Sequence, residues 1–380
     1  MEDRLLESLR AIDPAVLTDV VRQDQRNPNF EITDWSIQRL SDKGIINPDG
    51  LWLFSGEGSD GRQSQRWSVV LKILERPEQE RQPSDRRFWK RELFFVQSGL
   101  MERLPGPVKT PRFYRVEETS DGARIWQEYV VNQRPDPWSL DDYAFAAYQL
   151  GLWNGACACR VPLPDEPWLT RRHYQSWYSK ANPEQDFQFM LNQKYIYGDL
   201  RDRYDRLWSE REMFYNAWET LPQVFSHFDS QRRNLLIRKG GDQQDELVLV
   251  DWAVCGLGPL GAELFALVGM SAALFEWSPS ELPELDRAAF ASYLHGLGEA
   301  GWSGDTNMIR LAYATWISIY FGIVFPNIVA LWCTPEARTH ALQAFGVAEE
   351  EALLQWLPLF HYSLDCADEA RSLMKKLDLP

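Results

Sequence analysis

The chain has 380 residues, more than one hydrophobic core usually absorbs, so two lobes or domains are expected. Hydrophobic residues make up 44% of it and charged residues 25%, a globular composition that excludes a largely disordered chain. The formal net charge is −15, and nearly all of it arises after residue 130. A field of that sign disfavours nucleic acid and anionic membranes as partners.

The start of the chain has no long apolar run. Residues 1–10 carry mixed charge, which argues against a secretory signal and favours a cytoplasmic protein. Apolar residues recur at helical spacing through residue 25, which predicts two short helices. The five cysteines lack paired C-x-x-C units, so neither a disulfide framework nor a zinc site is indicated.

Aromatic and β-branched runs follow at residues 35–40, 51–54 and 67–74, separated by turn-forming residues. They predict an antiparallel meander, which runs at 111–116 and 123–130 would complete. The last of these leads into the connection between lobes, and we place the hinge at residues 127–130.

A charged residue interrupts the third run. Lys72 lies within Val-Val-Leu-Lys-Ile, and a lysine inside an apolar strand needs a partner or a ligand. Glu92 lies among apolar residues in a segment of helical spacing at 86–96, and it is a candidate to pair with Lys72. The alternatives are a lysine that extends to solvent and a solvated helix glutamate.

The loop between the first two strands, residues 41–50, lies where a nucleotide phosphate would be covered. Lys43 and Gly44 are candidate phosphate contacts, since a backbone-amide cradle needs only a turn of suitable shape. The loop lacks G-x-G-x-x-G, and an ordinary hairpin turn is the alternative.

Helical spacing dominates after residue 137, at about 140–160, 170–180, 185–195 and 200–220, and again from about 261 to the end. Strands first and helices later predict an α+β fold with a strand-rich lobe at 1–130 and a helical lobe at 131–380. Residues 311–332 carry no charge and are long enough to span a membrane. Polar residues and Pro326 within them favour a buried core helix instead.

The sequence His227-Phe228-Asp229-Ser230-Gln231-Arg232-Arg233-Asn234 carries the most specific pattern. Its spacing, H-x-D-x-x-x-x-N, is typical of the catalytic loop of protein-kinase-like enzymes, in which the Asp accepts a hydroxyl proton and the Asn binds a metal. Asp251 ends an apolar run seventeen residues later, where a second metal ligand is needed. Together these residues predict a phosphotransfer site.

With Lys72 and Glu92 ahead of them, residues 227–234 and Val250-Asp251-Trp252 resemble the aminoglycoside phosphotransferase and choline kinase group of the protein-kinase-like superfamily. The resemblance implies a protein-kinase-like two-lobe fold and transfer of the γ-phosphate of ATP or GTP to a hydroxyl of a small molecule.

The resemblance also implies residue roles. Asp229 would be the base, Asn234 and Asp251 the Mg²⁺ ligands, and Lys72 the contact to the α and β phosphates. His227 would brace the loop, and Arg232 would offset phosphate charge. Backbone groups of Glu128 and Val130 would bind the adenine edge. Arg233 is as well explained as a surface arginine.

One departure concerns the residues after Asp251. Many relatives carry G-D-P-x-x-D-L, whereas this chain has Gly256-Leu-Gly-Pro-Leu-Gly-Ala-Glu263, so we expect Glu263 to act structurally. The acidic helical lobe favours a cationic acceptor such as an aminoglycoside or an amino alcohol. A catalytically silent nucleotide-binding or scaffold protein of the same fold is the alternative, and the oligomeric state stays open.

Overall fold

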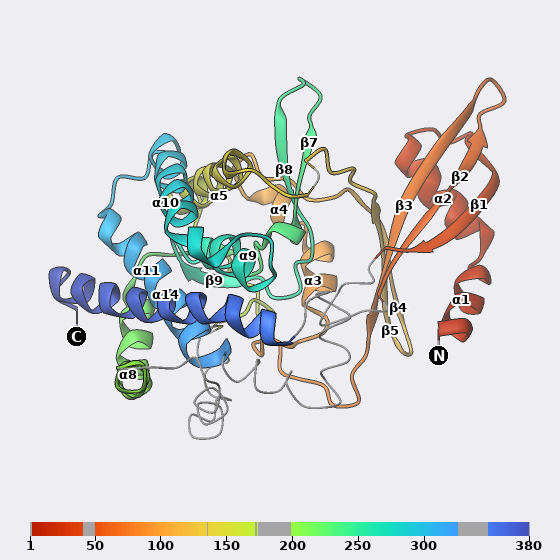
Figure 1. Cartoon of the computed structure of the whole chain (residues 1–380). Coiled ribbons are helices and arrows are strands. Elements are labelled where there is room, and N and C mark those ends of the chain that lie inside the picture. The colour runs from red at the N-terminus through yellow and green to blue at the C-terminus, as the bar shows by residue number, and fades with distance from the viewer. Residues whose placement is uncertain are drawn as a thin grey trace.

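The computed structural model describes residues 2–40, 50–134, 136–171, 173, 199–325 and 349–379. A five-stranded sheet with two N-terminal helices lies on one side of the molecule, and most of the helices lie on the other (Figure 1). The α+β class predicted from the order of strands and helices is confirmed.

The sheet is antiparallel throughout, in the order β1-β2-β3-β5-β4. Its strands are β1 Glu31–Arg39, β2 Leu51–Ser59, β3 Ser64–Glu75, β4 Phe113–Thr119 and β5 Gly122–Glu128. The predicted meander holds for the first three strands. β5 then pairs with β3 and leaves β4 at the edge, because the chain crosses through α3 (Arg91–Ser98) and α4 (Leu100–Arg103) before it returns.

The strand β3 divides the two faces of the sheet. Trp67, Val69 and Leu71 point to the outer face and join one buried cluster with α1 (Glu2–Arg10) and α2 (Pro14–Gln25). Because side chains alternate along a strand, Val70 and Lys72 point the opposite way, toward α3. The outer face is thus closed by the N-terminal helices, and part of the inner face packs against α3.

The helix that carries Glu92 begins later than its spacing predicted, at Arg91 instead of residue 86. The Asp85 side chain accepts the N–H of Arg87 at 2.8 Å, which makes a local turn, and the carbonyls of Pro83, Asp85 and Arg86 accept hydrogen bonds from the Arg91 guanidinium. The N–H groups of Phe88 and Arg91 donate to the carbonyls three residues before them, so this segment forms successive turns and the α-helix starts after it.

The helical half forms around one large core. Its helices and helical turns are α5 Leu140–Arg160, α8 Leu200–Thr220, η1 Arg232–Asn234, η2 Phe265–Gly269, α9 Met270–Ala273, η3 Pro279–Glu281, α10 Leu282–Glu299, α11 Thr306–Ile319, η4 Tyr320–Val324 and α14 Glu349–Lys376. α5, predicted at about 140–160 from its helical spacing, begins with a capping box between Ser139 and Asp142.

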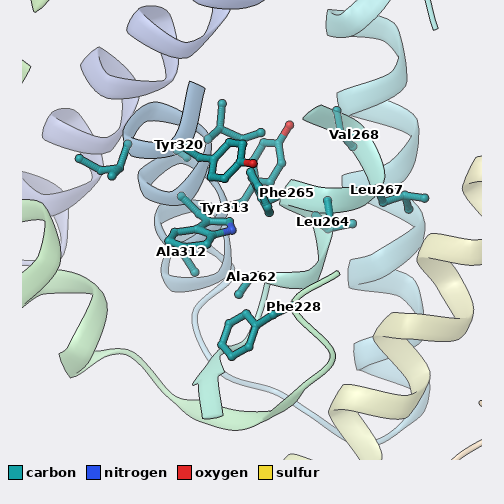
Figure 2. Packing of buried hydrophobic residues seen from close by; sticks show 14 of the residues in the cluster. Phe228, Ala262, Leu264, Phe265, Leu267, Val268, Ala312, Tyr313 and Tyr320 are labelled. Carbon is teal, nitrogen blue, oxygen red and sulfur yellow. The ribbon is translucent and has the colours of Figure 1, made fainter. Parts of the chain in front are cut away.

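Two short antiparallel pairs support the catalytic-loop segment: β6 (Gln223–Ser226) with β9 (Gly256–Pro259), and β7 (Leu235–Lys239) with β8 (Asp245–Leu249). The residues around them pack into the core, and Figure 2 shows Phe228 of the loop, the 262–268 segment and Tyr320 of η4 in this cluster. Phe265 packs edge-on against Tyr320 with ring centroids 4.7 Å apart. Apolar packing in the core of the helical half therefore supports the loop.

Three predictions concern segments that the structure covers in part. The expected helix at 185–195 and most of that at 170–180 lie outside the described residues. Residues 311–325 form buried helix, as expected for a core segment, and the rest of the uncharged stretch is not described. Among the described residues, no helix combines the length and apolarity needed to cross a membrane. The division at residue 130 stays a prediction.

Candidate active site

Lys72 is the centre of an ion triplet in which the side chains of Lys72 and Glu92 are buried. Its Nζ lies 2.5 Å from Glu92 Oε2 and 2.8 Å from Asp251 Oδ1. β3 supplies the lysine, the first turn of α3 supplies the glutamate, and the segment after β8 supplies the aspartate. The predicted Lys72–Glu92 pair is present, and the structure adds Asp251 as a second partner.

The charged groups in this triplet shift one another's pKa values. Burial alone would lower the pKa of Lys72, but Asp251 and Glu92 together raise it above its usual range. Burial tends to raise the pKa of Asp251, yet the nearby Lys72 holds it below its usual range. The lysine is thus a fixed cation, and the aspartate side chain, 43% exposed, stays ionised and open to a ligand.

Asp229 lies half-buried at the start of the predicted catalytic loop. Its Oδ1 accepts a hydrogen bond from Gln231 Nε2 at 3.0 Å, and its Oδ2 accepts one from Asn234 Nδ2 at 2.8 Å. Burial, and then the charge of Asp251, raise the pKa of Asp229 to about 8 despite these two donors. A carboxyl of raised pKa binds a proton firmly, and it can accept the proton of a hydroxyl only in its ionised form.

The Asn234 amide is oriented by the same contacts. Nδ2 donates to the Asp229 backbone carbonyl at 2.9 Å as well as to its carboxylate, so both amide protons face Asp229. The side-chain oxygen of Asn234 therefore points elsewhere and is the atom suited to a metal.

His227 joins the two halves of the site. Its Nδ1 accepts the Asp229 N–H at 3.2 Å, and its Nε2 lies 3.1 Å from the Val250 carbonyl, one residue before Asp251. Nε2 therefore carries the ring proton, and burial lowers the pKa of His227 to about 4, so the ring is neutral. These contacts connect the loop to the segment before Asp251 and suit the predicted role of His227 as a brace, which stays a prediction.

Glu263 holds the loop from the other side. It is 1% exposed, and its carboxylate accepts the His227 N–H and the Ser230 hydroxyl, the latter at 2.7 Å. Burial raises its pKa to about 7. The expectation that Glu263 is structural agrees with these contacts.

The loop backbone is strained where it turns. Phe228 and Asp251 have positive φ values of 64° and 65°. The Phe228 ring stacks on His173 with centroids 4.5 Å apart, and an added Cβ at Gly258 would lie 2.5 Å from that ring. Such strained backbone persists because the surrounding packing demands it, and it is common at functional sites.

Arg91 is the residue that sequence reasoning missed. It is fully buried, and its guanidinium donates to five backbone carbonyls, at distances of 2.5–2.9 Å. Those carbonyls belong to Pro83, Asp85, Arg86, Trp168 and Ala253. Because Ala253 follows Asp251 by two residues, Arg91 ties the start of α3 to the segment that carries the metal-ligand candidate. Arg91 belongs to no motif of fixed spacing, so no pattern in the sequence indicated its role.

The two loop arginines face protein carboxylates. Arg232 is buried, forms an ion pair with Asp136 and lies over the Trp138 ring, at 5.6 Å from its centroid. Arg233 Nε lies 2.7 Å from Glu276 Oε1. The structure thus links Arg232 to the segment after the sheet, and its predicted contact to phosphate stays a prediction.

Four other residues were predicted to contact the nucleotide, and the structure describes two of them, Glu128 and Val130. Lys43 and Gly44 lie outside the described residues. The Glu128 carboxylate accepts the Arg112 N–H and pairs with Arg238 Nη1 at 2.9 Å, while its own N–H donates to the Arg112 carbonyl. Val130 is buried two residues further on.

The donor set fits a magnesium ion that is held mainly by phosphates. Within the described part of the chain no three His, Cys, Asp or Glu side chains cluster as a metal site. Mg²⁺ in phosphotransfer sites typically takes one or two protein oxygens and completes its shell with phosphate and water. The second Asp251 oxygen and the Asn234 amide oxygen are the atoms available for it.

The chain resembles known proteins in sequence and in structure. Residues 134–304 match the model of the phosphotransferase enzyme family. No curated protein matches the sequence. A microcompartment-associated aminopropanol kinase has a similar structure, with a TM-score of 0.54 at 13% identity over 93% of this chain and 98% of that chain.

Two further structures are similar at comparable identity. An amicoumacin kinase in complex with AMP-PNP, Ca²⁺ and Ami has a TM-score of 0.51 at 12% identity, over 87% of this chain and 88% of that chain. A variant of aminoglycoside 2′-phosphotransferase-IIIa in complex with GDP has a TM-score of 0.50 at 12% identity, over 92% and 97% of the two chains. These likenesses show a protein-kinase-like fold. The match of residues 134–304 to the phosphotransferase family bears out the predicted resemblance to aminoglycoside phosphotransferases, and the similar structures share the fold.

Proposed function

We propose that this protein is a small-molecule kinase that transfers the γ-phosphate of ATP or GTP to a hydroxyl group. The observation that carries the proposal is the meeting of two sets of residues from distant segments. Lys72, Glu92 and Asp251 form one ion triplet, and the charge of Asp251 also acts on Asp229, which is hydrogen-bonded to Asn234. Phosphoryl transfer needs this combination of fixed cation, metal ligands and base.

Each residue has one task in the proposed reaction. Lys72 contacts the α and β phosphates, and Glu92 keeps it in place. Asn234 and Asp251 would hold Mg²⁺, which would neutralise charge on the phosphates. Asp229 orients the acceptor hydroxyl and receives its proton as the oxygen attacks the γ-phosphorus and the bond to the β-phosphate oxygen breaks. The transferred proton then resides on Asp229 until solvent removes it.

The acceptor is proposed to be small and cationic. The helical half of the chain holds most of the excess acidic charge, which concentrates cations near it. The aminopropanol kinase and the aminoglycoside phosphotransferase among the similar structures have amine-bearing compounds in their names. An aminoglycoside or an amino alcohol is therefore the first class to try.

The test is ADP release across a panel of aminoglycosides, amino alcohols, sugars and nucleosides, with Mg²⁺ and ATP or GTP. Asp229→Asn should bind ATP yet lose turnover by on the order of 10² or more, because the hydroxyl loses its proton acceptor. Asp202→Asn, an exposed carboxyl on α8, is the matched control and should leave turnover intact. Undiminished turnover in Asp229→Asn would overturn the base role.

Binding separates this proposal from a catalytically silent protein. Asp251→Asn should lose the thermal shift that Mg²⁺ and ATP produce together, since the cation loses a ligand. A wild-type protein that binds Mg²⁺ and ATP but releases no ADP with any acceptor of the panel would favour the scaffold alternative.

A further inference from the structure

The hairpin of β7 and β8 carries the proposed metal ligands at its base. Asn234 directly precedes β7, and Asp251 follows the end of β8 by two residues. The Val250 N–H donates to the Asn234 carbonyl at 3.0 Å and closes the hairpin there. Figure 1 shows this hairpin between the five-stranded sheet and the helices. A movement of the hairpin relative to the sheet would therefore move both ligands relative to Lys72.

Arg238 of β7 ties the hairpin to the sheet. Its Nη1 lies 2.9 Å from Oε1 of Glu128, the last residue of β5, and its Nε lies 3.1 Å from Oε2 of Glu246, directly opposite on β8. One rigid guanidinium thus holds a carboxylate of the sheet and a carboxylate of the hairpin. The side chains of Arg238 and Glu128 are 24% and 15% exposed, so solvent screens this pair less than it screens a surface ion pair.

The Glu128 carboxylate is itself held on the sheet side. It accepts the Arg112 N–H at 3.1 Å, and the Arg112 Nε lies 3.4 Å from it. Burial opposes the charge of Glu128, but the Arg112 N–H and the charges of Arg238 and Arg112 outweigh burial and keep its pKa below its ordinary value. Arg112 Nη2 also lies 3.3 Å from Asp24 Oδ1 of α2. Arg238 is therefore attached to an anion that is fixed in place.

Backbone hydrogen bonds join the hairpin to the same side of the molecule. The Gln133 N–H, five residues after Glu128, donates to the Ile237 carbonyl of β7 at 2.8 Å. On β8, the Leu249 N–H donates to the Lys109 carbonyl at 2.9 Å. Because both bonds form between the hairpin and other segments, exchange of these two amide hydrogens with solvent reports whether the hairpin stays attached.

The Lys72–Asp251 pair also connects the sheet to the hairpin segment, but the proposed nucleotide would engage both of its members. Phosphates would draw on Lys72, and the metal would draw on Asp251. The side chains of Glu128 and Arg238 have no such task in the proposed reaction. Their ion pair can therefore persist while the nucleotide is bound, when the pair of Lys72 and Asp251 is weakened.

We propose that Arg238 is a positioning residue, an inference that rests on the proposed kinase function. Through Glu128, it keeps Asn234 and Asp251 aligned with Lys72 while the nucleotide is bound. Without this ion pair the hairpin and the sheet can shift against each other. A site whose phosphate contact and metal ligands lie on shifted parts binds Mg²⁺ and ATP less tightly, because the alignment must then be restored at each binding event.

The experiment compares wild type with Arg238→Met, Glu128→Gln and the double variant. Calorimetry with Mg²⁺ and ATP, without an acceptor, should show a Kd raised on the order of 10-fold in Arg238→Met and partly restored in Arg238→Lys. The double variant should bind about as Arg238→Met does, because both changes break one pair. KM for ATP should rise with Kd while kcat stays within about two-fold, since Asp229 and Asn234 remain bonded to each other.

Hydrogen exchange supplies a measurement that needs no nucleotide. The Gln133 and Leu249 amides should exchange faster in Arg238→Met than in wild type. Lys239→Met is the matched control: Lys239 is the next residue of β7, its Nζ lies 2.6 Å from Asp245 Oδ1, and the variant should match wild type in exchange and in Kd.

Two results would overturn the positioning role and leave the kinase proposal intact. One is an Arg238→Met protein that binds Mg²⁺ and ATP as tightly as wild type or more tightly. The other is unchanged exchange of both amides in Arg238→Met, which would show that the ion pair does not attach the hairpin. A wild-type protein that binds no nucleotide overturns the kinase proposal and the role that rests on it.

Discussion

The surroundings of Asp229 disfavour the ionised form of its carboxyl group. Replacing Asp229 by asparagine should therefore stabilise the folded protein at alkaline pH. Burial is the main cause and Asp251 adds to it, and together they raise the pKa from 3.8 to about 8. Between those two values the unfolded chain has an ionised carboxyl and the folded protein a neutral one. Folding therefore takes up a proton, and stability falls as the pH rises through this window.

The structure sets the size of the effect. The pKa of Asp229 rises from 3.8 to about 8, and a difference of one in pKa corresponds to ~1.4 kcal/mol. Above pH 8, the ionised carboxyl therefore lowers the free energy of unfolding by at most about 6 kcal/mol. Solvent reaches the half-buried carboxyl and screens it, so we expect a gain of roughly 1–3 kcal/mol from the neutral amide. For a chain of this size that gain is a few °C in Tm.

The replacement itself keeps the local contacts. The new amide faces two donors, Gln231 Nε2 and Asn234 Nδ2, and the Gln231 side chain can rotate to present its oxygen. Asp202→Asn, on the exposed side of α8, controls for the loss of one negative charge.

The assay is thermal unfolding of wild type, Asp229→Asn and the control between pH 4 and pH 9 without nucleotide. The Tm gain of Asp229→Asn should be near zero at pH 4 and largest at pH 8 and above. A gain that does not depend on pH, or a loss at pH 8, would refute the assignment of a raised pKa to this carboxyl.

Three further variants test the supports of the site. Glu92→Gln removes the charge that holds Lys72 and should raise KM for ATP on the order of 10-fold with an unchanged circular dichroism spectrum; an unaltered KM would argue against the orienting pair. Arg91→Lys reaches fewer of the five carbonyls, and with about 1 kcal/mol lost per unpaired carbonyl it should lower Tm by several °C and also raise KM for ATP. If KM stays constant while Tm falls, Arg91 acts on stability alone. Glu263→Ala leaves the His227 N–H and the Ser230 hydroxyl without their acceptor and should lower kcat on the order of 10-fold, with partial recovery in Glu263→Gln. Equal kcat in wild type and Glu263→Ala would show that the loop needs no such anchor.

Local patterns in the sequence were enough for much of the fold. The strand runs, the helical spacing at about 140–160 and the spacing of residues 227–234 all depend on neighbours in the chain, and the structure has elements at those places. The Lys72–Glu92 pair was also predictable, because a lone charge in an apolar strand requires a partner. The start of α3 was not, since the segment before it forms successive turns whose carbonyls bind the Arg91 side chain.

The sequence by itself determined the class of chemistry, because the residue types and their spacing within one loop and one strand limit what the site can do. The tertiary structure alone decided how those residues are held. Arg91 gathers carbonyls from segments as far apart as Pro83, Trp168 and Ala253, and Glu263 reaches back to a loop 36 residues earlier. Such contacts join residues whose separation along the chain carries no periodic signal, so only the packing of the folded chain brings them together.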